Sequence, residues 1–461
     1  MPDPAGAAPD RRPASPTAGA RPGQSGSGPS LKTREAWSSP AGFILASIGS
    51  AVGIGNIWRF PYMVGTHGGG AFLIPYLLAV VLLGLPLMIA ELTLGRHFRR
   101  SVVPAFEAIG TSLRGLGLFL VFVLTMILAY YLVVTGWVLA YFVAFAAGAP
   151  MSFADFTNSY APLFFFVLSG GICFLVVRAG VRAGIERLSA LLMPVLFVMV
   201  SVLAGVALAL PGAARGVRFY LAPDFSALGD PLVWTAAFGQ AFFSLGAGTG
   251  VMLTYGSYLP HGNVVRSAGL ITGADLLVAL IGGLVVFPTV FAFGFDPAAG
   301  VQLAFVTLPR IFQEMRLGLL FGATFFLLLF IAALTSAVSL LELPVATLID
   351  AYGMRRTPAT AVTAGTVLLV GFPSALSYTA LKVELFGVPL LDLKDFAFGT
   401  IGMIVAALVV SVTAGWLAPA RIVTADMGAR RGVRRLFLMA LRWVIPLVLG
   451  VTLAARVLER R

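Results

Sequence analysis

Eleven apolar runs, each long enough to cross a membrane as a helix, constrain the fold of this chain more than any other feature. A helix needs about 20 residues to span roughly 30 Å of hydrocarbon. Because a backbone in lipid must satisfy its own hydrogen bonds, such runs predict an all-α polytopic membrane protein. The runs lie near residues 40–63, 70–94, 115–146, 161–179, 187–210, 231–258, 267–295, 319–352, 358–376, 395–417 and 437–456.

Composition supports this class and argues against others. Of 461 residues, 59% are hydrophobic and 11% are charged, whereas soluble domains carry about 25% charged residues. The net charge of +12 does not indicate a nucleic-acid surface, because the arginines fall between the apolar runs. Most Lys and Arg residues lie in segments that are cytoplasmic if the N-terminus is inside. This bias predicts a multi-pass protein of the cell (inner) membrane with a cytoplasmic N-terminus.

The sequence gives little support for a disulfide, a metal cluster or a membrane enzyme. The single cysteine, Cys173, lies in an apolar run, so no intramolecular disulfide forms and a metal cluster is not expected. His67, His97 and His261 all lie away from mid-span, where a membrane enzyme would need its base, so we expect no enzyme. Residues 1–31 are rich in Pro, Gly, Ala and Ser and lack an apolar signal core. They predict a disordered cytoplasmic tail.

Two of the helices are predicted to be broken in mid-membrane. Residues 50–62, "SAVGIGNIWRFPY", interrupt the first run with glycines and polar residues, and residues 239–253, "GQAFFSLGAGTGVML", do the same in the sixth. Helices that lie five apart in sequence run in opposite directions, as an inverted repeat of helices 1–5 and 6–10 requires. Glycine also lets membrane helices pack closely. Two clusters at matching positions, beside Asn56 and Ser244, favour breaks over packing.

A broken helix predicts a binding site. Its freed N–H and C=O groups are tolerated only where they line a cavity buried in protein or filled with water. Half-helix N-termini favour an anion such as a carboxylate, whereas freed carbonyls and the oxygens of Asn56 and Ser244 suit a hard cation such as Na⁺. Glycine permits the unusual backbone angles and leaves room for a ligand.

The motifs around these breaks resemble those of the neurotransmitter:sodium symporter family. The run "SAVGIGNIWRFPYMVGTHGGGAFLIPY" resembles its first-helix signature, and "GQAFFSLG", "ALTSA" and "DFAFGTIG" resemble its sixth, eighth and tenth helices. The resemblance covers residues 32–456 and implies a LeuT-type 5+5 inverted repeat with eleven transmembrane helices. The first repeat would occupy residues 32–210, the second residues 231–417 and the last helix residues 437–456.

The resemblance also implies two sodium sites. The residues of the first would be the carbonyl of Ala51, Asn56, Ser244 and, with a register open by one residue, Asp275. Those of the second would be the carbonyls of Gly49, Val52 and Ala332 and the hydroxyls of Thr335 and Ser336. Read alone, such membrane hydroxyls more often bond back to carbonyls of their own helix.

Gly53 indicates, through the same resemblance, an amino-acid substrate. Relatives that carry amines are similar but hold an aspartate there, whereas glycine leaves space for the substrate's own carboxylate to meet sodium. Tyr131 resembles the tyrosine that touches this carboxylate, although it could also be a packing aromatic. The expected substrate-binding residues are Ser50, Ala51, Gly53, Gly55, Ile127, Tyr131, Phe243, Ser244, Gly246, Thr249, Ser336 and Leu340. The side-chain pocket among them carries no charge, which predicts a neutral, hydrophobic or aromatic L-amino acid.

Charged residues within or at the ends of the runs suggest further roles. Two gates are implied, Arg59 with Asp395 outside and Arg34 with Asp350 inside, each pair forming when its side closes. Arg59 lies within the membrane, which by itself indicates function, whereas Asp350 could also be a solvated helix end. Asp275 would act as a fixed anion against two Na⁺, which predicts no chloride requirement, unless it is a protonated, hydrogen-bonded carboxyl.

Two glutamates remain. Glu91 resembles the family's helix-2 glutamate that satisfies freed donors of the sixth helix, and Glu342 replaces a residue that is usually uncharged. The role of Glu342 is open at this point.

The sequence therefore predicts a sodium-coupled secondary active symporter that imports its amino acid by alternating access. The alternative is a membrane amino-acid sensor of the same fold that binds without transporting. A sensor usually carries a signalling domain, which neither the head nor the tail of this chain is long enough to hold. Which amino acid is carried, the Na⁺ stoichiometry and the oligomeric state do not follow from the sequence.

Overall fold

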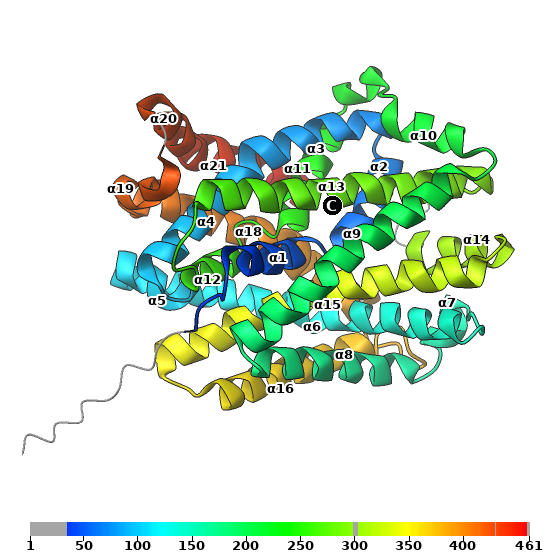
Figure 1. Cartoon of the computed structure of the whole chain (residues 1–461), viewed down its shortest axis with the longest axis horizontal. Coiled ribbons are helices and arrows are strands. Elements are labelled where there is room, and N and C mark those ends of the chain that lie inside the picture. Colours follow the sequence, from blue (N-terminus) through cyan, green and yellow to red (C-terminus); the bar gives the residue numbers. More distant parts are fainter. Residues whose placement is uncertain (1–34, 298–302, 429, 459–461) are drawn as a thin grey trace, which may run out of the picture. The chain divides into compact units, whose positions relative to one another are not determined.

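The computed structural model describes residues 35–297, 303–428 and 430–458, and these are almost entirely helical (Figure 1). The predicted tail, residues 1–31, and the gate residue Arg34 lie outside the described residues.

Nine helices of the described ranges are long and apolar enough to cross a membrane without a sharp bend. They are η2–α4 (Gly70–Phe98), η4–α6 (Thr111–Ala146), α8 (Ala161–Arg178), η5–α9 (Val181–Leu208), α13 (Val264–Ala292), α15 (Gly318–Tyr352), α16 (Arg356–Ala375), α17–η9 (Leu390–Leu417) and α20–α21 (Arg431–Leu458). Within the composite spans, the α-helical parts are α3 (Leu73–Ala79), α4 (Leu85–Phe98), α6 (Arg114–Ala146), α9 (Arg187–Leu208), α17 (Leu390–Lys394), α18 (Met403–Val412), α20 (Arg431–Met439) and α21 (Ile445–Leu458).

Two further spans are broken, as the sequence predicts. The first consists of α1 (Pro40–Ala51) and the segment Gly55–Thr66, which ends in α2 (Phe60–Thr66), and its halves are bent by 50°. The second consists of α11 (Pro231–Leu245) and α12 (Val251–Ser257). Counted with the nine continuous spans, these make the eleven transmembrane helices that were predicted.

Local chemistry explains where the broken helices start and stop. Pro40 and Pro231 open α1 and α11, and in each case the preceding side chain, Ser39 or Asp230, accepts a hydrogen bond from a backbone N–H of the first turn. Between α11 and α12, Gly246, Gly248 and Gly250 have φ values of 56°, 84° and 87°. Side chains other than glycine are strained in that region, so these glycines are what permits the break.

Short elements connect the spans at both ends of the bundle. They are α5 (Val102–Ile109), α7 (Phe153–Thr157), α10 (Ala213–Leu221), α14 (Leu308–Glu314), α19 (Ala420–Val423) and an antiparallel hairpin of β1 (Glu384–Leu385) and β2 (Val388–Pro389).

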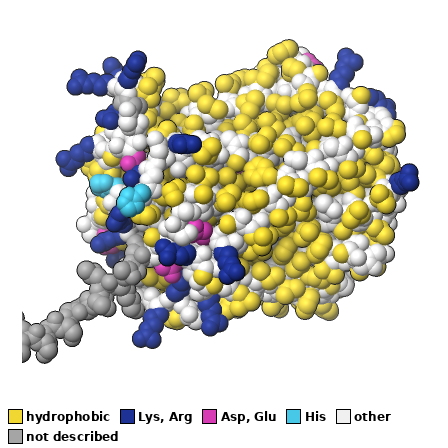
Figure 2. All heavy atoms as spheres, in the orientation of Figure 1, with side chains coloured by type: hydrophobic (Ala, Val, Ile, Leu, Met, Phe, Trp, Pro, Cys, Tyr) yellow, Lys and Arg dark blue, Asp and Glu magenta, His cyan; other side chains and the backbone are white. Residues whose placement is uncertain are grey.

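The broken helices lie at the centre of the bundle. Helix α1 packs against α9, α13 and α15, and α12 packs along α4 (Figure 1). Space-filling atoms show a broad hydrophobic belt across the face in view, with Lys and Arg side chains gathered mainly at the end that carries α5, α12, α19 and α20 (Figure 2). This belt, together with the long apolar helices, is typical of a multi-pass membrane protein.

Candidate functional site

Three polar side chains meet where the two helix breaks approach the seventh span. The Asn56 amide nitrogen donates to Ser244 Oγ at 2.9 Å and to Asp275 Oδ1 at 2.7 Å, and the Ser244 hydroxyl donates to Asp275 Oδ2 at 3.0 Å. All three are buried, with Asn56 and Asp275 completely so. The structure therefore brings together the three side chains expected at the first sodium site, and Asp275 is the helix-7 residue that faces them.

The chain around the first break is tied down by two amides. Asn56 Oδ1 accepts a hydrogen bond from the Gly53 N–H at 2.9 Å. The Gln240 side chain donates to the Gly55 carbonyl at 3.0 Å. Sequence reasoning did not single out Gln240, although it lies four residues before Ser244 and hence on the same face of α11. The first contact satisfies a backbone N–H that lies in the break, and the second adds a side-chain donor to a carbonyl that already accepts from the Phe60 N–H.

The hydroxyls expected at the second sodium site have different partners. Ser336 Oγ lies 3.4 Å from the Gly49 carbonyl and 3.1 Å from the Val52 carbonyl, both at the end of α1. Thr335 instead donates back to its own helix, to the carbonyls of Ile331 at 3.0 Å and Ala332 at 3.2 Å. Only Ser336 thus reaches the break directly, while the Thr335 oxygen keeps acceptor capacity for an ion.

A small cavity of about 70 Å³ lies against these groups. Of the expected substrate-binding residues, all twelve line it: Ser50, Ala51, Gly53, Gly55, Ile127, Tyr131, Phe243, Ser244, Gly246, Thr249, Ser336 and Leu340. Leu124, Val251, Ser339 and Met403 also line it and were not expected. Ser339 accepts a hydrogen bond from the Ser50 hydroxyl at 2.8 Å. It follows Ser336 by one helical turn, which is the spacing that could have identified it.

Glycines give this cavity its free volume. A Cβ added at Gly53 would lie 2.8 Å from Ser336 Oγ and 3.2 Å from the Tyr131 hydroxyl, so even an alanine would crowd the space between them. A Cβ added at Gly246 would meet nothing within 4 Å. The Tyr131 hydroxyl also accepts a long hydrogen bond from the Ile54 N–H at 3.5 Å. The tyrosine therefore faces the first break, where a ligand carboxylate could meet it.

A second, larger cavity of about 710 Å³ adjoins the first. Gly55, Tyr131 and Phe243 line both cavities, and Arg59 and Asp395 line the larger one. In the described structure no ion pair joins Arg59 to Asp395. The Arg59 guanidinium instead lies 3.9 Å from the centroid of the Phe243 ring. Arg59 and Asp395 therefore line this cavity without pairing across it.

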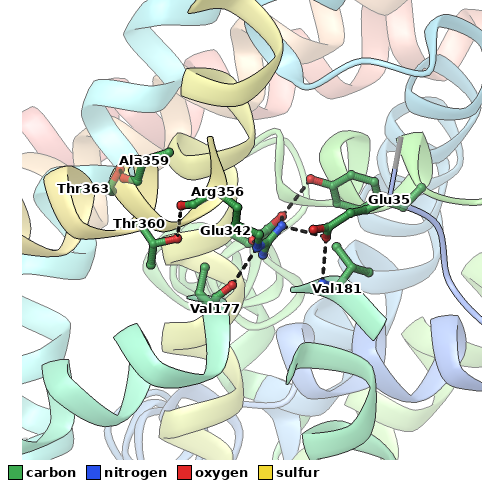
Figure 3. A network of polar contacts seen from close by, with 9 residues as sticks. Glu35, Val177, Val181, Glu342, Arg356, Ala359, Thr360 and Thr363 are labelled. Carbon is green, nitrogen blue, oxygen red and sulfur yellow. Dashed lines mark hydrogen bonds and ion pairs between the residues drawn. The ribbon is translucent and has the colours of Figure 1, made fainter. Parts of the chain in front are cut away.

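The opposite end is closed by a partly buried ion-pair network, which supplies a role for Glu342 (Figure 3). The Arg356 guanidinium contacts Glu342 at 2.5 Å and 3.2 Å and Glu35 at 2.8 Å. Arg356 also donates to the Val177 carbonyl at 2.7 Å. Glu35 in turn accepts from the Val181 N–H at 2.8 Å. These residues join the segment before α1 to α8, η5, α15 and α16.

Aromatic residues also pack together at the end that holds this ion-pair network. The Trp37 indole donates to the Tyr255 carbonyl at 3.0 Å, and its ring packs edge-on against Tyr255 and Tyr258 with centroids 5.1 and 6.1 Å apart. The Tyr258 hydroxyl donates to Glu342 Oε1 at 2.7 Å. The segment before α1 is thus fastened to the end of the broken span α11–α12.

Two more predicted residues can be placed. The Glu91 carboxylate accepts from the N–H groups of Gly248 at 2.9 Å and Gly250 at 2.5 Å, so it does satisfy the donors freed by the second break. Asp350 accepts from the Ser101 N–H at 2.7 Å. Its expected partner Arg34 lies outside the described residues, so the inner gate stays a prediction.

Comparison with known families gives one clear match. The sequence profile of the Sodium:neurotransmitter symporter family matches residues 34–162 and 151–460. A sodium-dependent transporter of Bacillus subtilis, YhdH, is 38% identical over 392 residues, which cover 82% of this chain and 86% of YhdH. The human sodium- and chloride-dependent taurine transporter is 30% identical over 69% of this chain and 61% of its own length.

A solved structure shares the architecture. The crystal structure of MhsT in complex with L-phenylalanine superimposes with a TM-score of 0.85 at 38% identity, covering 92% of this chain and all of that one. The two proteins therefore have the same fold over nearly their whole length.

Proposed function

Because this chain belongs to the Sodium:neurotransmitter symporter family, a family of sodium-coupled transporters, we propose that it imports a neutral L-amino acid with an apolar or aromatic side chain. Import would be driven by the inward Na⁺ gradient and would proceed by alternating access. The observation that carries this proposal is the cavity at the helix breaks, which is polar at one end and uncharged along the rest of its lining.

The polar end suits Na⁺ and a carboxylate together. Ser244 and Asp275 present side-chain oxygens, which a hard cation prefers, beside the Asn56 side chain, whose Oδ1 accepts from the Gly53 N–H. With the Ala51 carbonyl they would form the first sodium site, and the ion would contact the substrate carboxylate directly. The Tyr131 hydroxyl would donate to the same carboxylate. A second Na⁺ would lie among the carbonyls and hydroxyls of Gly49, Val52, Ala332, Thr335 and Ser336.

The remaining lining selects the side chain of the substrate. Ile127, Phe243 and Leu340 supply apolar surface, and Gly246 leaves open space beside them. A charged side chain would lose its hydration there without gaining a counter-ion. The structure of MhsT bound to L-phenylalanine supports a substrate of this class.

Asp275 would make chloride unnecessary. Two Na⁺ and a zwitterionic amino acid leave a positive excess in a site of low dielectric constant, and a fixed carboxylate offsets part of it. The taurine transporter of the family is named as chloride-dependent, and in this chain Asp275 would take over the role of that anion.

Orientation follows the charge bias. We assign the end closed by Arg356 and Glu342 to the cytoplasm and the open cavity lined by Arg59 and Asp395 to the outside of the inner membrane. In this assignment the structure is an outward-facing state, ready to receive substrate.

Uptake into proteoliposomes tests the proposal. Radiolabelled leucine, phenylalanine or tryptophan should accumulate under an imposed Na⁺ gradient and not when K⁺ or choline replaces Na⁺. Asn56→Ala and Thr335→Ala should each weaken apparent Na⁺ affinity by about 5- to 150-fold, since each removes a polar partner worth about 1–3 kcal/mol. Thr324→Ala is a matched control, because Thr324 lies on the same helix and its hydroxyl only bonds back to Leu320 at 2.8 Å. Equal uptake with and without Na⁺ would refute the proposal.

A further inference from the structure

A pocket rich in arginine lies at the end of the bundle that carries α19 and α20, and it shares no lining residue with the transport site. It has a volume of about 570 Å³ and is formed by α19, α20 and η11 (Ala440–Val444). Five arginine side chains line it: Arg421, Arg431, Arg434, Arg435 and Arg442. We call this the arginine pocket.

The positive charge of the arginine pocket is not neutralised within the described ranges. The acid nearest in sequence, Asp426, is paired with Arg96 at 3.4 Å. None of the ion pairs seen in the described part of the chain includes an arginine of the pocket. Five like charges around one cavity repel one another unless an anion joins them. Arginine binds phosphate through two parallel hydrogen bonds, so a phosphate group fits this lining.

One of the five arginines is held in place by the protein. Arg442 Nε donates to the Gly415 carbonyl at 2.6 Å, and its guanidinium lies 5.8 Å from the ring of Trp416. The other four are exposed. The pocket thus combines one guanidinium held by the protein with four exposed arginine side chains, whose length lets them reach an anion between them.

The surroundings of the pocket place it at the surface of the membrane. Trp443 lines it, is 61% exposed and packs edge-on against Trp416, which is 49% exposed. Leu436 and Met439 on α20 are also exposed, at 61% and 47% of their surface. Tryptophan is enriched where hydrocarbon meets headgroups. Figure 2 shows Lys and Arg side chains beside the hydrophobic belt at this end, where α19 and α20 lie in Figure 1.

We propose that the arginine pocket binds the phosphate headgroup of an anionic phospholipid, whose acyl chains lie along Trp443 and the exposed apolar side chains below it. A basic pocket at the cytoplasmic end of membrane helices attracts anionic lipid through both charge and position. A soluble anion would use the charge but would gain nothing from the exposed tryptophans and leucine, which is why a lipid fits better.

Fluorescence quenching by brominated lipid tests this on the full-length protein. The chain has 6 tryptophans, so the signal of the pocket is isolated by subtracting the spectrum of Trp443→Phe. Protein is reconstituted into phosphatidylcholine vesicles that contain a minor share of brominated phosphatidylglycerol or, in parallel, of brominated phosphatidylcholine with the same acyl chains. The preference for phosphatidylglycerol should fall about tenfold or more in Arg431→Gln/Arg434→Gln/Arg435→Gln, because each charge contributes to the attraction.

Two controls sharpen the result. The corresponding triple change to lysine keeps the charge and should retain most of the preference, and Arg266→Gln removes an exposed arginine outside the pocket and should change nothing. If the triple glutamine variant does not elute as folded protein, Arg434→Gln alone should still reduce the preference measurably. Equal quenching by both lipids in the wild type, or an unchanged preference in the glutamine variants, would overturn the proposal. Loss of the preference in millimolar inorganic phosphate would overturn it in favour of a soluble anion.

Discussion

The ion pair of Arg356 and Glu342 predicts an unequal response to removing either partner. Arg356→Met would leave the Glu342 carboxylate, whose side chain is 0% exposed, without a countercharge. Glu342→Gln would leave Arg356, which is 14% exposed, still paired with Glu35 at 2.8 Å. Breaking a buried pair costs about 3–5 kcal/mol when a buried charge is left alone. We expect that cost for Arg356→Met and about 1–2 kcal/mol for Glu342→Gln, since one hydrogen-bonding partner is weakened.

Both substitutions destabilise the closed state of the end that holds this ion pair. They therefore shift the equilibrium between its closed and open states toward the open state. With about 1.4 kcal/mol for each factor of ten, the open population should rise at least about 100-fold in Arg356→Met and about 5- to 30-fold in Glu342→Gln. The double variant Arg356→Met/Glu342→Met removes both charges and should return to within about tenfold of the wild type, because a buried pair can often be replaced by apolar residues at little cost.

Cysteine labelling measures the open population. Ser47 is completely buried on α1, and Cys173 is also buried, so Ser47→Cys in a Cys173→Ala background reports opening through its rate of reaction with a polar maleimide. Glu107→Gln is the control, because it breaks an exposed pair with Arg114 at 3.4 Å whose side chains are 37% and 42% exposed. Exposed pairs are worth about 0–1 kcal/mol. Equal labelling rates in Arg356→Met and Glu342→Gln would refute the reasoning, as would rates no higher than in the control.

Three further changes address the transport site. Thr249→Phe should shift substrate preference from bulky toward small amino acids, because Thr249 lines a cavity of only about 70 Å³, and competition by glycine, leucine and tryptophan measures it; identical competition profiles would show that the pocket is elsewhere. Wild-type uptake should persist when gluconate replaces chloride, while Asp275→Asn should lose most activity or come to depend on an added anion; collapse of wild-type uptake in gluconate would contradict this role. Glu91→Leu should lower stability by about 2–6 kcal/mol in thermal unfolding, because it strips the N–H groups of Gly248 and Gly250 of their acceptor, and a variant as stable as the wild type would contradict that reading.

Much of the fold could be predicted because each membrane helix corresponds to a continuous apolar run in the sequence. The run predicted at 161–179 is α8 (Ala161–Arg178), and that at 319–352 is α15 (Gly318–Tyr352). The two breaks were predictable for a different reason, since glycine clusters and polar residues are costly in a span that lacks a ligand site. The eleven-helix architecture and the family were confirmed on these grounds.

Contacts between residues that are far apart in the sequence were harder to predict. Nothing in the residues around Glu342 indicates which of the 31 Lys and Arg residues would be its partner, because Arg356 is brought to it by the turn between α15 and α16. The register of Asp275 was open by one residue, since the loop before its helix varies in length, and only packing orients its carboxylate toward Asn56 at 2.7 Å. The roles of these residues in ion binding stay predictions.

The stacking of Arg59 on Phe243 has a consequence for the speed of the transport cycle. To pair with Asp395, the Arg59 guanidinium must leave the ring that now lies 3.9 Å away. A cation–π contact is worth about 0.5–2 kcal/mol, and a pair at a water-filled entrance about 0–1 kcal/mol. In the gate predicted from the sequence, closing would exchange one weak contact for another, and neither contact alone would create a deep energy minimum. We predict that a substrate side chain packed against the Phe243 ring shifts the balance between the two arrangements.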